Sequence, residues 1–200
     1  HSECTNIDAA SFQQALGIGN AGGGLGTGGS RIVRKRDRII AYNPSKGSDI
    51  TNRIIAAVSQ YQIAQGLQGN ASVLMVPVQH MQSSAALLAR ARVYIDFGHH
   101  PGQDRLPREA VRCGCVVMTG VRGSAGLYAD VPLPESLKMQ NPLAELDATV
   151  VRILDAVDRY QDLAAEMSAY SQFVAQQRQA DILTSQSLVV LLDGAHYALT

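Results

Sequence analysis

Residues 93–125 read VYIDFGHHPGQDRLPREAVRCGCVVMTGVRGSA, and this stretch decides the fold. Its two apolar runs, 93–97 and 115–119, predict strands, and the segment 107–113 between them predicts a short helix that starts at a tolerated proline and ends at Gly114. Apolar runs without polar alternation are typical of strands covered on both faces of a parallel sheet. Both polar loops should therefore open at the same edge of that sheet, where α/β proteins bind ligands.

The rest of the chain extends the same alternation. Strands are predicted at 39–42 and 72–77, and helices at 50–64 and 81–92, the first of them capped by Ser48 or Asp49. Apolar residues at helical spacing predict two more helices, around 143–157 and 163–174, whereas 188–192 fits either a helix or a strand. The order predicts an α/β fold: a Rossmann-like parallel sheet with helices on both faces, followed by C-terminal helices.

A glycine-rich segment precedes the predicted fold. Residues 17–30 contain G-x-G-x-x-G at Gly17, Gly19 and Gly22, but no strand precedes this motif and no helix follows it, so we interpret it as a flexible tether. The expected organisation is an arm at 1–30, a ligand-binding domain at 31–175 and a helical or apolar extension at 176–200. The basic run 31–38 is interpreted as a solvated lead-in to the first strand.

Composition excludes several classes of protein. Seventeen basic residues balance seventeen acidic ones, so net charge offers no attraction for nucleic acid. No apolar run approaches the roughly 20 residues that span a bilayer. Three cysteines fit neither a disulfide framework nor a usual zinc site, so we expect a reduced, cytoplasmic protein.

Three segments at the expected ligand edge carry residues suited to phosphate and sugar. Lys46 and Gly47, between the first strand and its helix, can offer an ammonium and backbone N–H groups to a phosphate, or form only a capped turn. The loop after the last strand, with the small residues Gly123, Ser124 and Ala125, can approach an anion closely or serve as a flexible connection.

The third segment precedes and begins the short helix. Arg105 and Arg108 are guanidinium donors suited to a diphosphate, and Glu109 either supports the start of the helix or binds ribose hydroxyls. His99 and His100 are adjacent, without a third ligand at a metal-binding spacing, so no metal site is predicted. No residue is assigned a catalytic role.

The run Arg105-Leu-Pro-Arg-Glu-Ala-Val-Arg-Cys-Gly-Cys-Val-Val-Met-Thr-Gly resembles the donor-site signature of GT-B-type glycosyltransferases, in the glycogen-synthase and sucrose-synthase-like group. Lys46-Gly47 resembles the Lys-Gly of their C-terminal domains. The resemblance covers about residues 38–175. It implies a domain that binds a UDP- or GDP-sugar for glycosyl transfer, with no obligatory metal or other cofactor.

The resemblance also implies roles for individual residues. Glu109 would hold the ribose, Lys46 and a loop arginine the diphosphate, and residues 123–125 the sugar or phosphate. Pro101 stands where the group usually has a sugar-contacting Glu, and the spacing from Leu-Pro to Glu109 is one residue shorter, so Asp104 or His100 is the expected substitute.

The resemblance implies an acceptor domain as well. Because residues 1–30 cannot supply one, we expect a truncated enzyme, one piece of a split enzyme, or a donor domain that works with an N-terminal acceptor domain or a partner chain. The alternative is a non-enzymatic α/β module whose C-terminal helices dock a partner domain.

Overall fold

The structure, a computed structural model, describes residues 36–78 and 81–197. Five parallel strands form one sheet in the order β2-β1-β3-β4-β5. Their bounds are β1 Asp37–Tyr42, β2 Leu74–Pro77, β3 Ala91–Asp96, β4 Val116–Gly120 and β5 Lys138–Met139. The predicted Rossmann-like α/β architecture is confirmed.

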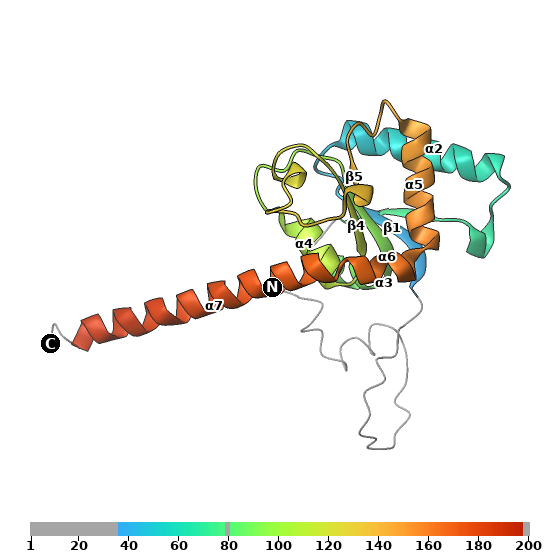
Figure 1. Ribbon diagram of the computed structural model, residues 1–200. Helices are drawn as coiled ribbons and strands as arrows, with labels where there is room; N and C mark the ends of the chain where they lie inside the picture. Colours follow the sequence, from blue (N-terminus) through green and yellow to red (C-terminus); the bar gives the residue numbers. More distant parts are fainter. Residues whose placement is uncertain (1–35, 79–80, 198–200) are drawn as a thin grey trace, which may run out of the picture.

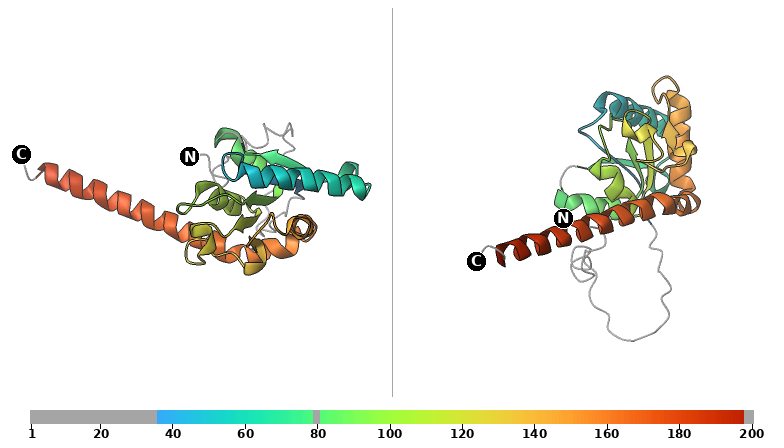
Figure 2. Two further views of the ribbon diagram at one scale, coloured as in Figure 1. Left: turned by 90° about the horizontal axis from the view of Figure 1, so that it is seen from above. Right: turned by 60° about the vertical axis from the view of Figure 1, so that its left-hand side comes forward.

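Helices cover both faces of the sheet. Helices α2 (Ser48–Ala64) and α5 (Leu146–Asp158) pack against each other on one face. Helices α3 (Met81–Arg90) and α4 (Arg105–Arg112) lie on the other face, where α4 contacts α7 (Ser168–Tyr197) (Figures 1 and 2). The helix α6 (Tyr160–Glu166) links α5 to α7, and the short 3-10 turns η1 (Gly69–Ala71), η2 (Ser124–Gly126) and η3 (Glu135–Leu137) complete the fold.

The core consists of the two faces of the sheet and the inner sides of these helices. Ile40, Val93, Ile95 and Val117 on the strands and Ile54 on α2 are fully buried. This explains why the strands are continuous apolar runs, because a polar side chain on either face would lose its hydration.

The strand order creates a topological switch point beside β1. The chain leaves β1 for β2 on one side and returns past β1 to β3 on the other, so the connecting helices α2 and α3 lie on opposite faces. In such sheets a crevice opens at the carboxyl ends of the two strands at the switch. Here these are β1 and β3, and the loops that follow them carry the residues of the candidate site.

Several element boundaries differ from the sequence prediction. The helix α3 ends at Arg90, so Ala91, expected on a helix, begins β3. The predicted helix at 163–174 is divided at Met167 between α6 and α7, and the two-residue β5 was not predicted. Residues 188–192, ambiguous in sequence, continue α7 as helix.

The predicted starts of α2 and α4 are also corrected. The N-cap of α2 is Gly47, and neither Ser48 nor Asp49 caps the helix with a side chain, because both lie within its first turn. Helix α4 begins at Arg105 and not at Pro107, which makes Glu109 its fifth residue and moves this carboxylate out of capping position.

The glycine-rich segment 17–30 and residues 31–35 of the basic run lie outside the described residues.

The next basic residue, Arg36, is a structural anchor. Its guanidinium donates to the carbonyl oxygens of Leu88 at 2.7 Å, of Ala91 at 2.6 Å and of Cys113. In the described part of the chain, no helix is long and apolar enough to cross a membrane.

Candidate functional site

The loops that follow β1 and β3 meet at two glycines. A Cβ added at Gly47 would lie 2.9 Å from the Cα of Gly98, and one at Gly98 would lie 2.6 Å from the Cβ of Lys46. Gly47 also has a φ of +60°, which favours glycine. The lack of side chains at both positions therefore lets Lys46 reach over the end of β3.

Asp96, at the end of β3, anchors the site to the sheet. Its carboxylate accepts hydrogen bonds from Asn43 Nδ2 at 3.0 Å, the Tyr94 hydroxyl at 3.1 Å and the Gly98 N–H at 3.1 Å. Burial alone would raise the pKa of Asp96, but His100, Asn43 and Gly98 outweigh it and the pKa lies below its usual value. Asp96 is thus held at this edge of the sheet by hydrogen bonds.

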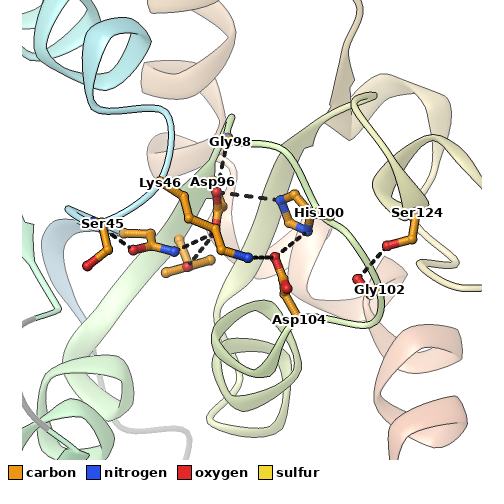
Figure 3. Close-up of polar contacts among 10 residues, drawn as sticks. Ser45, Lys46, Asp96, Gly98, His100, Gly102, Asp104 and Ser124 are labelled. Carbon is orange, nitrogen blue, oxygen red and sulfur yellow. Dashed lines mark hydrogen bonds and ion pairs between the residues drawn. The ribbon is translucent and has the colours of Figure 1, made fainter.

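His100 lies between two carboxylates. Its Nε2 is 3.5 Å from Asp96 Oδ1 and its Nδ1 is 3.3 Å from Asp104 Oδ2, within ion-pair distance but outside good hydrogen-bond geometry. Asp104 also accepts from Lys46 Nζ at 2.6 Å. Acidic and basic side chains thus alternate in a row that runs from the sheet to the loop after β1 (Figure 3). In order, they are Asp96, His100, Asp104 and Lys46.

Exposure divides this row into an inner and an outer part. His100 is completely buried and lies against Asp96 and Asp104. About a third of the Lys46 side chain, 34%, is exposed, and it can turn toward a ligand. Lys46 is thus a cation at the switch point that solvent can reach.

Asp96, His100 and Asp104 also form a possible ligand set for a metal ion. Their ligand atoms lie within 4.8 Å of one another. However, the two carboxylates face opposite ring nitrogens, Lys46 already neutralises Asp104, and donors surround Asp96. The geometry therefore favours a charge network over a metal centre.

Helix α4, whose N-cap Asp104 contacts Lys46, adds a second cation and a carboxylate. Arg105 Nη1 and Glu109 Oε1 are 3.2 Å apart, with half of the Arg105 side chain and a third of the Glu109 side chain exposed. Burial raises the pKa of Glu109, while Arg105 opposes the shift. Arg108 differs, because its Nη1 donates to Gln103 at 2.5 Å and to Gln177 of α7 at 2.6 Å, which ties α4 to the long helix.

The loop after β4 is joined to the loop after β3. The His100 N–H donates to Arg122 O at 3.1 Å, and the Ser124 N–H donates to His100 O at 2.9 Å. The Ser124 hydroxyl donates to Gly102 O (Figure 3). Gly123 has a φ of +70°, and a Cβ there would lie 2.0 Å from His100 O, so only glycine fits. Ala125 is buried.

The structure thus brings together Lys46, Gly47, His100 and Asp104 at the switch point, with Arg105 and Glu109 on the adjoining helix. It does not leave Arg108 or the Ser124 hydroxyl open, since protein atoms already pair with both. Sequence reasoning missed Asn43 and Tyr94 as partners of Asp96. The sequence carried no spacing signal for the charge network, because residues 97–104 form a loop without helical periodicity.

No protein-family model matches the chain, and no curated protein sequence matches it. Among solved structures, it is similar to Alr3699/HepE of Anabaena in complex with UDP-glucose, with a TM-score of 0.36 and 15% sequence identity over 86% of this chain and 52% of that chain. The chain thus spans about half the length of that protein.

Proposed function

We propose that this chain binds the diphosphate and ribose of a nucleoside-diphosphate sugar at the carboxyl edge of its sheet. The observation that carries the proposal is the Lys46–Asp104 contact, which holds an ammonium from the β1 loop against the N-cap of α4. This contact joins Lys46-Gly47 to the residue immediately before the Arg105–Gly120 run, and these are the two motifs in which the sequence resembles GT-B donor sites. A diphosphate placed here would meet Lys46 and Arg105.

Each group has a chemical part in this proposal. Lys46 and Arg105 donate charge-assisted hydrogen bonds to diphosphate oxygens. Glu109, partly exposed one turn along α4 from Arg105, accepts hydrogen bonds from the ribose hydroxyls. Binding would break the ion pairs Lys46–Asp104 and Arg105–Glu109, which are partly exposed and therefore cost little to replace.

The reaction that such a site serves is glycosyl transfer. For this reaction the protein must position the reactants and stabilise the negative charge that develops on the departing diphosphate. The cations of this site would supply that stabilisation. The acceptor would be held by another domain or a partner chain. Glycosyl transfer would therefore require that domain or partner as well as this site.

The test is thermal unfolding and calorimetric titration of the full chain with UDP, GDP and UDP-glucose. We expect at least one of them to protect the fold, and K46A and E109A to remove the protection. R53A is the matched control, because Arg53 is exposed on α2, away from the switch point. Absence of binding by every nucleoside diphosphate would refute the proposal.

The alternative, an interaction module, is favoured by one feature. Helix α7 continues well beyond its contact with α4 and projects from the domain (Figure 1), with Ile182 and Leu183 exposed at 38% and 54%. If the chain is such a module, light scattering will show self-association or a stable complex, and no nucleotide will alter its unfolding.

A further inference from the structure

A row of buried polar residues crosses the carboxyl ends of four neighbouring strands. Asp96 on β3 is in register with Thr119 on β4, and Thr119 with Lys138 on β5. On the other side of β3, Asn43 follows β1 and donates to Asp96. Side chains in register on adjacent strands point to the same face, so the row lies on one side of the sheet.

The two halves of this row differ in how their polar atoms are satisfied. Asn43 and Asp96 bond each other and the surrounding loops. Among the residues that the structure describes, Thr119 Oγ1 and Lys138 Nζ have no hydrogen-bond partner, although the two residues are 0% and 3% exposed. Hydrogen bonds within the protein therefore account for the burial of Asn43 and Asp96, but not for that of Thr119 and Lys138.

A buried ammonium without a hydrogen-bond partner is costly, because it loses its hydration. Burial lowers the pKa of Lys138, and the nearby carboxylate of Glu135 only partly opposes the shift. An apolar side chain at position 138 would make the folded state more stable. An unsatisfied pair of donors next to a ligand edge indicates that something outside the protein accepts from them.

The position of the pair connects it to the candidate site. Thr119 lies one residue before Gly120 and the 121–126 loop, which is bonded to His100. Strand spacing of about 4.8 Å puts Lys138 about 10 Å from β3, on the side away from Lys46. The pair therefore borders the same edge at its opposite end.

We propose that Thr119 and Lys138 form a binding niche for an anionic oxygen, from either a carboxylate or a phosphate. The ammonium of Lys138 and the hydroxyl of Thr119 both donate to that oxygen. If the oxygen belongs to the carboxylate of a donor sugar, the niche selects acidic donors, and that part alone rests on the function proposed above.

The experiment measures thermal unfolding of the full chain with inorganic phosphate and with glucuronate, each matched in ionic strength by sodium chloride. In ligand-free buffer we expect K138M to unfold about 2–4 °C higher than the unaltered chain, because a methionine of similar length removes the buried charge. At least one anion should raise the midpoint of the unaltered chain, and K138M should lose that rise. R53M removes one exposed charge elsewhere and should keep it.

T119V, nearly the same shape as the native residue, should reduce the anion response and serves as the second variant if K138M does not fold. A response to phosphate alone or to glucuronate alone identifies the source of the oxygen. Stronger protection by UDP-glucuronate than by UDP-glucose, lost in K138M, would place the carboxylate on the donor sugar.

Three outcomes would overturn the niche: no response of the unaltered chain to either anion, a response that K138M and T119V both retain, or K138M less stable than the unaltered chain in plain buffer. These outcomes are separate from the donor-site test. Loss of UDP binding in K46A depends on Lys46, whereas the response to phosphate or glucuronate alone depends on Lys138.

Discussion

Lys46 and Asp104 lie 58 residues apart in sequence, yet their side chains form an ion pair of 2.6 Å. This contact joins the loop after β1 to the N-cap of α4, across the switch point of the sheet. Asp104 is held in turn from the inside by His100, which rests against Asp96 on β3. The exposed lysine is thus positioned through a short row of side chains that ends in the core.

The first prediction concerns Lys46. We expect K46M to weaken UDP binding at least about tenfold, since a charge-assisted hydrogen bond contributes about 1.5–3 kcal/mol. Because the Lys46–Asp104 pair is partly exposed, stability to urea should change by less than about 1 kcal/mol. Calorimetric titration and urea unfolding measure the two quantities, and an unchanged dissociation constant would contradict the role of Lys46.

The second prediction concerns the close approach of the loops. A methyl group in G98A would lie 2.6 Å from Lys46 Cβ and 3.1 Å from Asp96 Oδ1, so the loop must shift. We expect a loss of stability of about 1–3 kcal/mol, together with weaker UDP binding. The matched control is G102A in the same loop, where an added Cβ meets nothing within 4 Å. Equal behaviour of the two variants would show that the contact between loops is unimportant.

The third prediction concerns Asp96 and acid. Its pKa in the folded state lies below the ordinary value of 3.8, so the unfolded chain takes up the proton more readily. The stabilisation by Asp96 is therefore complete above the ordinary carboxyl pKa, and it is lost as the pH falls through the lower folded value. At pH 7, D96A should lose about 3–5 kcal/mol, because it removes one member of a buried charged network.

Urea unfolding of the unaltered chain and of D96A, measured from pH 7 down to pH 2, tests this expectation. The difference in unfolding free energy between the two proteins should be constant near neutral pH and should shrink only in the acid range. A difference that did not depend on pH would mean that the charge of Asp96 is not what stabilises the fold.

The fourth prediction concerns Lys138 and base. Its pKa in the folded state lies below 10.5, so the unfolded chain binds the proton more tightly and the charge penalises the folded state. This penalty is complete below the folded pKa and disappears as the pH rises above 10.5. The extra stability of K138M over the unaltered chain should therefore be largest near neutral pH and decrease toward pH 10.5, as chemical denaturation can measure.

Some features of the fold follow directly from local sequence. Apolar runs such as 93–97 and 115–119 predict covered parallel strands, and these lie side by side as β3 and β4. Helix starts could not be read in the same way. Gly47 caps α2 where its backbone passes Gly98, and this constraint comes from a residue in the loop after β3.

The meeting of the loops after β1 and β3 was predictable. Loops after parallel strands meet at one edge, so Lys46, Asp104 and Glu109 could be expected near one another. The interior part was not predictable, because the burial of His100 between Asp96 and Asp104 depends on how the 97–104 loop folds back. The niche at Lys138 was hidden for a similar reason, since the two-residue β5 has no periodicity from which to recognise it.

The joining of the 97–104 loop to the 121–126 loop has a consequence for the order in which the protein folds. The backbone of His100 bonds to Arg122 and Ser124, and Asp104, beside its side chain, pairs with Lys46 far toward the N-terminus. Contacts this distant in sequence close large loops and form late, at an entropic cost. During synthesis, the ligand edge would thus take shape only after β4 and the turn beyond it have left the ribosome, while β1 and β2 can pair earlier.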